Sequence, residues 1–102
     1  MFVARNFVSR GGKGEIDLIG CDRETLVFVE VRTRTARETQ AALPELSITP
    51  EKQRVVARTT QRFLNQRHVK ECPLRFDVVA IEELPDQAPV VRLTKNAFSP
   101  AM

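Results

Sequence analysis

Two strongly apolar segments, separated by a helical pattern, limit the possible folds of this chain more than any other feature. The first runs from Thr25 to Arg34 and the second from Arg75 to Glu82, and both are rich in residues that favour β-strands. When a helix joins two neighbouring strands of one sheet, the strands lie parallel and the crossover is right-handed. The sequence therefore predicts an α/β domain with a mixed sheet.

The helix between these two strands has a clear start. Thr49 suits the N-cap and Pro50 suits the first helical position. Side chains that can be buried then recur at helical spacing and form one stripe: Val55, Val56, Thr59, Phe63 and Leu64. The helix should end before Pro73, and the polar stretch at about residues 33–48 that precedes it is predicted to be a flexible loop.

Three shorter segments complete the predicted sheet. Phe2 to Ser9 and Glu15 to Ile19 read as strands that precede the first apolar segment, with a glycine-rich turn between them. Val90 to Thr94 reads as a short edge strand at the end of the chain. The predicted order is β-β-β-α-β-β, with a helix on one face of the sheet, in a single domain of residues 1–102.

Carboxylates lie inside two of these otherwise apolar strands. Because side chains alternate along a strand, Glu15, Asp17 and Ile19 should share one face, with the intervening residues on the other. By the same rule Glu30 and Arg32 should share one face of the following strand. The function of the chain depends on whether these two sets of side chains meet.

The length of the hairpin connection decides how the acids meet. Residues directly opposite one another in an antiparallel pair share a face, so the connection must contain an even number of residues. A two-residue turn at 23–24 would place Asp17 opposite Glu30, whereas a loop at 21–24 would place Glu15 opposite Glu30. Either register gathers three acids and one guanidinium into a small patch.

Carboxylates that lie this close repel each other unless a cation lies between them. Arg32 could supply the charge, in which case the patch is a buried ion-pair network. A divalent metal could supply it equally well, since Mg²⁺ binds a few carboxylates, keeps several waters and leaves room for phosphate oxygens. A bound metal can activate water and neutralise charge on a phosphodiester. The residues alone leave both interpretations open.

Composition excludes several other classes of protein. The cysteines Cys21 and Cys72 are too few for a disulfide scaffold, and with His68 they do not match the ligand spacing of a zinc module. No apolar run approaches the ~20 residues that span a bilayer, and no signal peptide is recognised, so we expect a soluble cytoplasmic protein without a membrane partner. The net charge of +3 permits a phosphate-bearing partner without requiring one.

The two acidic blocks, GEIDLI and LVFVEVR, resemble the signature of the PD-(D/E)xK nuclease superfamily. More closely, the chain resembles the YraN-like family, uncharacterised bacterial proteins regarded as candidate endonucleases and related to archaeal Holliday-junction resolvases. ARNF, ITPEKQR, RFDVVAIE and KNAF, in that order, also look like this family. The resemblance covers nearly the whole chain apart from residues 33–47.

The resemblance implies a restriction-endonuclease-like fold and a metal-dependent endonuclease that acts on DNA, duplex or branched. Asp17 matches the catalytic acid, and Glu30 and Arg32 match the E-x-K pair, with Glu15 as an assisting group. Asp17, Glu30 and the carbonyl of Val31 would hold Mg²⁺ or Mn²⁺.

The resemblance also implies a phosphate-binding surface at the start of the helix. Gln53 would face phosphate, with Lys52, Arg54 and Arg34 as neighbouring nucleic-acid-binding residues. A helix N-terminus offers free N–H groups and the positive end of the helix dipole to an anion. Asp77, in the last apolar strand, is interpreted as structural rather than catalytic.

The chain departs from the pattern of its relatives at two points. Superfamily members usually carry lysine where Arg32 stands, and an arginine stays charged, so it can clamp a phosphate but cannot accept a proton. Family members also begin with a helix before the first strand, whereas this chain starts at the strand. A bare sheet face would favour a homodimer. An alternative function is therefore a nucleic-acid-binding module with impaired catalysis, and a third is a structural role in which the acids only pair with Arg32.

Overall fold

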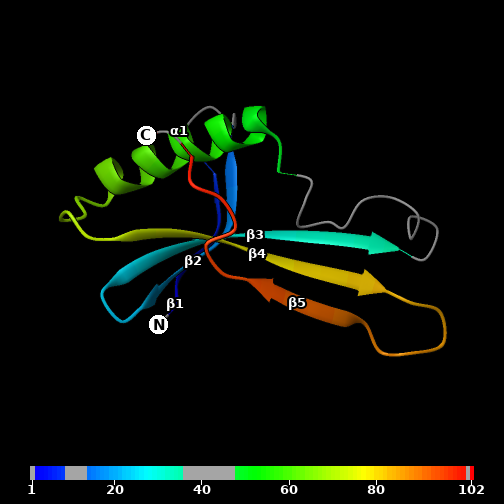
Figure 1. Cartoon of the computed structure of the whole chain (residues 1–102). Helices are drawn as coiled ribbons and strands as arrows, with labels where there is room; N and C mark the ends of the chain where they lie inside the picture. Colours follow the sequence, from blue (N-terminus) through cyan, green and yellow to red (C-terminus); the bar gives the residue numbers. More distant parts are fainter. Residues whose placement is uncertain (1, 9–13, 36–47, 101) are drawn as a thin grey trace.

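The computed structural model describes residues 2–8, 14–35, 48–100 and 102 (Figure 1). The elements are, in order, β1 (Phe2–Val8), β2 (Glu15–Asp22), β3 (Thr25–Thr35), α1 (Pro50–Gln66), β4 (Leu74–Glu83) and β5 (Val90–Thr94). The predicted order β-β-β-α-β-β is confirmed. The predicted loop begins later than expected, because residues 33–35 continue β3, and residues 36–47 lie outside the described residues.

The strands form one five-stranded sheet in the order β1-β2-β3-β4-β5. β3 and β4 are parallel, and the other neighbouring pairs are antiparallel. α1 connects the two parallel strands, which confirms the mixed sheet and the crossover expected from the sequence. In the described part of the chain, no helix is both long enough and apolar enough to cross a membrane.

The core lies between α1 and one face of the sheet. Leu26 and Phe28 of β3 and Phe76 of β4 face Val56 and Phe63 of the helix, and all five are buried. The Phe63 ring lies edge-on to Phe28, with ring centroids 5.9 Å apart, and Phe28 stacks on Phe76 at 5.4 Å. Each such side chain contributes about 1.5–3 kcal/mol by its burial, so this cluster holds the helix on the sheet.

The alternation of side chains along β2 is interrupted between Ile16 and Ile19. Ile16 and Ile19 are both in the core, with 1% and 0% of their surface exposed, although residues three positions apart on a regular strand lie on opposite faces. Arg5 pairs with Leu18 and Phe7 pairs with Ile16, but Asn6 and Asp17 between them do not form a pair. Asn6 also has a left-handed φ of 50°. Glu15 precedes Ile16 and so does not share the face of Ile19, and the prediction that Glu15, Asp17 and Ile19 share one face is therefore wrong for Glu15.

The start of α1 is built as its sequence predicts. Thr49 is the N-cap, and its Oγ1 accepts a hydrogen bond from the Lys52 N–H at 3.1 Å. Pro50 occupies the first helical position, where its missing N–H costs nothing. This cap fixes where the helix begins over the sheet, and so it fixes the position of Lys52.

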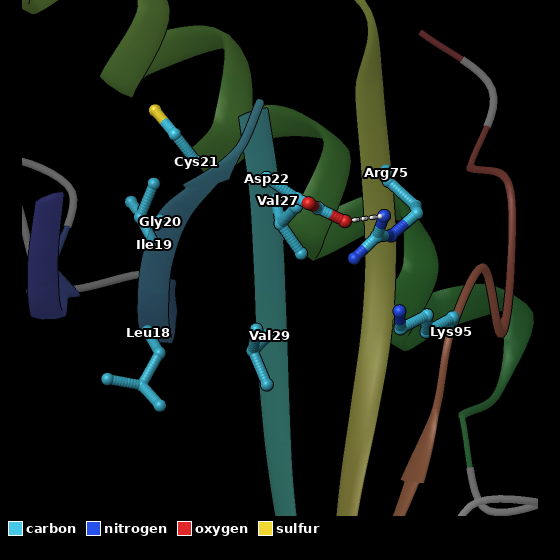
Figure 2. A pocket seen from close by; sticks show the side chains of 9 residues that line it. All are labelled: Leu18, Ile19, Gly20, Cys21, Asp22, Val27, Val29, Arg75 and Lys95. Atoms are coloured by element: carbon cyan, nitrogen blue, oxygen red, sulfur yellow. Dashed lines mark hydrogen bonds and ion pairs between the residues drawn. The ribbon is translucent and has the colours of Figure 1, made fainter. Parts of the chain in front are cut away.

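The face of the sheet opposite α1 carries a shallow hollow of about 410 Å³ (Figure 2). Leu18, Val27 and Val29 form its apolar floor, while Arg75 and Lys95 stand at its edge. The predicted homodimer stays a prediction.

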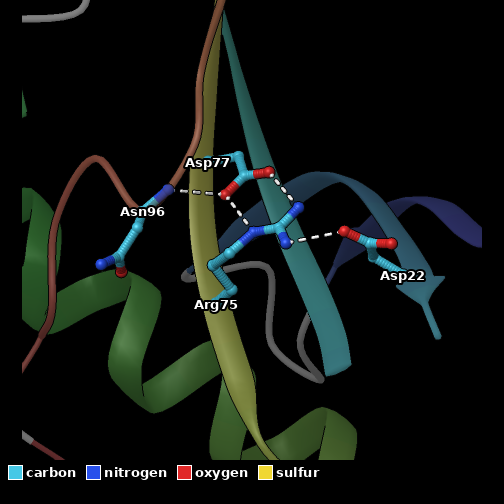
Figure 3. Close-up of polar contacts among 4 residues, drawn as sticks. All are labelled: Asp22, Arg75, Asp77 and Asn96. Atoms are coloured by element: carbon cyan, nitrogen blue, oxygen red, sulfur yellow. Dashed lines mark hydrogen bonds and ion pairs between the residues drawn. The ribbon is translucent and has the colours of Figure 1, made fainter. Parts of the chain in front are cut away.

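Asp77 and Arg75 together join three separate parts of the chain beside this hollow (Figure 3). Its carboxylate accepts two hydrogen bonds from Arg75 and one from the backbone N–H of Asn96, each 2.9 Å long. Arg75 also pairs with Asp22 at the end of β2. These contacts suit the structural interpretation of Asp77.

Candidate functional site

The hairpin between β2 and β3 brings the two acidic blocks together. The register runs from Asp22↔Thr25 to Leu18↔Val29, so the turn consists of the two residues at 23–24. Of the two registers that the sequence allowed, this is the one that sets Asp17 opposite Glu30 when it is continued by one pair. The contact is direct, because the backbone N–H of Val31 donates to Asp17 Oδ2 at 2.8 Å.

Glu30 is a buried carboxylate at the boundary between the core and this site. It is 5% exposed and lies two residues beyond Phe28 on the helix-facing side of β3. Burial raises the pKa of Glu30, and the nearby charge of Asp17 raises it further, while Lys52 and Arg32 act in the opposite direction. The charge on Glu30 is therefore only partly compensated by the protein.

Two cations lie beside the acids. Lys52 reaches down from the first turn of α1 and places Nζ 3.6 Å from Glu30 Oε2. Arg32 follows Glu30 on the same strand face, and its buried Nε has no hydrogen-bond partner among the described residues. A buried donor without an acceptor costs free energy, so Arg32 is placed to receive an oxygen ligand.

The other residues predicted for the site lie elsewhere or are otherwise engaged. Glu15 is exposed and pairs with Val8 of β1. Within residues 2–8, 14–35, 48–100 and 102, no cluster of three or more His, Cys, Asp or Glu side chains could hold a metal, so Glu15 does not belong to one. Gln53 donates its amide to the carbonyl of Ile48 at 3.3 Å, and Arg54 is exposed on the helix.

Arg34 lies further along β3 and is part of a charge cluster that the sequence did not reveal. Arg34 and Arg92 both pair with Glu82, which lies beside Arg34 in the parallel register of β3 and β4. Two guanidinium groups lower the pKa of the Glu82 carboxyl, with Arg92 as the larger cause. Reading the register of the two parallel strands could have found the Arg34–Glu82 pair, whereas Arg92 depends on the later pairing of β5.

The donor groups at the acid pair fit a divalent cation that keeps part of its water shell. Val31 directs its N–H toward β2, and a strand residue directs its C=O to the same side, so this carbonyl faces the same region as Asp17. Two carboxylates and one carbonyl are all hard oxygen donors of the kind that Mg²⁺ and Mn²⁺ bind. The incomplete compensation of Glu30 also favours an added cation.

A mixed five-stranded sheet with one helix between its third and fourth strands defines the class of protein: the chain has a restriction-endonuclease-like α/β fold. The sequence then places it within that class. Residues 1–81 match the uncharacterised protein family UPF0102, and the chain belongs to this family. This confirms the YraN-like resemblance of its motifs.

Curated relatives support the same assignment. UPF0102 protein GSU0650 of Geobacter sulfurreducens is 41% identical over 96 residues, which cover 94% of this chain and 72% of the relative. UPF0102 protein STH1475 of Symbiobacterium thermophilum is 44% identical over 96 residues, covering 94% and 78%. A UPF0102 protein of Geotalea daltonii is 42% identical over 94 residues, covering 92% and 71%. These names assign a family and no activity.

Proposed function

We propose that this chain is a metal-dependent endonuclease that hydrolyses phosphodiester bonds in DNA. One observation carries the proposal: Asp17 and Glu30 adjoin at the start of α1, with the cationic side chains of Lys52 and Arg32 beside them. Carboxylates with a perturbed pKa that are grouped with specific charged partners are typical of functional sites.

The proposed roles follow from the chemistry of each group. Asp17, Glu30 and the Val31 carbonyl would hold Mg²⁺ or Mn²⁺, which when bound supplies positive charge to the phosphate and activates water. Arg32 keeps its proton, so it binds a phosphate oxygen and stabilises developing negative charge rather than accepting a proton. Lys52 stands at the helix start, where the free N–H groups and the helix dipole also favour an anion.

The proposed substrate class is DNA, with branched DNA as the particular form that the resemblance to Holliday-junction resolvases suggests. The chain carries 16 basic and 13 acidic side chains, so attraction to the phosphate backbone is modest overall and must come from local placement. We therefore expect binding that weakens as salt is raised.

Cleavage assays with a matched pair of variants test the proposal. The protein is incubated with Mg²⁺ or Mn²⁺ and with duplex, single-stranded, flapped and four-way DNA. Asp17→Asn should lower the cleavage rate by roughly 10²–10³-fold, the usual scale for losing a group that stabilises the transition state. Asp22→Asn, an exposed acid on the same strand, should leave the rate unchanged. No cleavage on any substrate, together with no Mn²⁺ binding by calorimetry, would refute the proposal.

Arg32 favours a second candidate function, a nucleic-acid-binding module with impaired catalysis. If the reaction needs a lysine at this position to accept a proton, the arginine cannot replace it. This alternative predicts salt-sensitive DNA binding that Asp17→Asn does not change, and no cleavage by the unmodified chain. Cleavage that appears only in Arg32→Lys would select it over the endonuclease.

A further inference from the structure

The ion pair between Lys52 and Glu30 is longer than the ion pair made by Asp77, another buried acid. The Lys52 Nζ and Glu30 Oε2 atoms are 3.6 Å apart, longer than the 2.7–2.9 Å of a good charge-assisted hydrogen bond. Asp77, in contrast, is held by two parallel bonds of 2.9 Å from Arg75. The Lys52–Glu30 pair is therefore the looser of the two.

The side chain of Lys52 is also free to leave. It is 34% exposed and stands on the first turn of α1, where a four-carbon stem can swing its ammonium group toward water or back to the acid. Its backbone is fixed by the Thr49 cap, so movement of the ammonium group requires no change of the helix.

The charges at the site indicate how the Lys52–Glu30 pair would respond to a metal ion. Counted by formal charge, the two acids Asp17 and Glu30 are matched by the two cations Lys52 and Arg32, although burial disfavours the charge on Glu30. A divalent cation at the acids would leave a surplus of two positive charges. It would repel the Lys52 ammonium from Glu30 and at the same time make the site attractive to a phosphodiester.

We propose that Lys52 is the counter-ion of the acid pair in the metal-free protein, and that a divalent cation displaces it so that its ammonium group binds the substrate phosphate. This inference rests on the proposed function and deepens it. It assigns to Lys52 a direct competition with the metal for Glu30, beyond the phosphate contact expected from the sequence.

Calorimetric titration with Mn²⁺ in the absence of DNA tests the competition without an activity readout. Lys52→Met keeps most of the length of the side chain and removes its charge, so it should bind Mn²⁺ about 2- to 5-fold more tightly, the scale of a partly exposed ion pair. Arg58→Met, at an exposed cation nearly two turns further along the same helix, should leave the Mn²⁺ affinity unchanged. With Mn²⁺ present, the DNA affinity of Lys52→Met should also depend less steeply on salt concentration, by about the amount that one phosphate contact contributes.

The outcomes separate the inference from the function on which it rests. If the unmodified protein binds Mn²⁺ and Asp17→Asn abolishes binding, but Lys52→Met binds Mn²⁺ no more tightly, the inference is wrong and the endonuclease proposal stands. If the unmodified protein binds no Mn²⁺, the inference is wrong, and if it also cleaves none of the DNA substrates, the endonuclease proposal is wrong as well. Circular dichroism checks folding of each variant, and Lys52→Gln must show the same tightening as Lys52→Met.

Discussion

Replacing Asp77 with alanine removes the acceptor of three hydrogen bonds inside the sheet. Asp77 is 2% exposed, and its carboxylate binds the Arg75 guanidinium through two bonds and the Asn96 N–H through a third, all of 2.9 Å (Figure 3). The variant therefore removes the side-chain link between β4 and the segment that follows β5, whereas the bond from the Ala97 N–H to the Phe76 carbonyl remains.

The size of the expected loss follows from these contacts. A hydrogen bond to a charged group contributes roughly 1.5–3 kcal/mol, and breaking a fully buried ion pair costs roughly 3–5 kcal/mol. Arg75 keeps Asp22 as a partner and is partly exposed, so no wholly buried charge is stranded. We expect Asp77→Ala to lower the free energy of unfolding by about 2–4 kcal/mol. At about 4–8 °C per kcal/mol for a domain of this size, Tm should fall by roughly 10–25 °C.

Thermal unfolding followed by circular dichroism measures this loss, and Asp22→Ala is the matched control. It removes the other carboxylate from the same guanidinium, but Asp22 is exposed and screened by water, so Tm should change by only a few degrees. Asp77→Asn, which keeps the shape of the side chain, should fall between the two. Equal losses for Asp77→Ala and Asp22→Ala would show that the buried contacts do not hold β4 in place.

Two further predictions concern the site and the packing of β2. Because the folded protein holds a proton on Glu30 more tightly than the unfolded chain does, the charge on Glu30 lowers stability as pH rises from the ordinary glutamate range through the raised pKa. The test compares the Tm of Glu30→Gln with that of the unmodified protein in buffer that contains a chelator. The variant should have nearly the same Tm in acid and an increasingly higher Tm as the pH rises toward neutral. A difference in Tm that stays flat or falls with pH would contradict this. Gly14→Ala would place a Cβ 2.1 Å from Thr59 Oγ1, a hydroxyl already fixed by its bond to the Val55 carbonyl. We expect a loss of about 1–3 kcal/mol in urea unfolding, and an unchanged midpoint would refute the close approach of Gly14 to α1.

The parts of the fold that were predictable from sequence depend on local signals. β3 and β4 are apolar along their length, and Thr49–Pro50 is a helix start that needs no tertiary contact to recognise. The break in side-chain alternation between Ile16 and Ile19 was not predictable, because it appears only when both residues pack into one core. The turn at 23–24 was one of two possibilities, since neither residue is a glycine, although Arg23 adopts a left-handed φ of 58°.

The candidate site divides in the same way. The adjacency of Asp17 and Glu30 could be derived from the hairpin, since both residues belong to neighbouring strands of known polarity. The Lys52–Glu30 contact could not, because it depends on how far along β3 the helix begins. Membership of UPF0102 adds no information on this point, as the family is itself uncharacterised.

The start of α1 links the stability of the protein to its candidate site. On the helix-facing side of β3, Leu26 and Phe28 lie in the core, Glu30 is buried at its edge, and Arg32 lies beyond it. Figure 1 shows β3 and β4 continuing past the helix at this point. The Thr49 cap therefore decides where apolar packing gives way to charge, and a helix that began one turn later would remove Lys52 from Glu30 and leave that carboxylate without its cation. The same short sequence that begins the helix thus also positions Lys52, the only cationic side chain of α1 that pairs with these acids among the described residues.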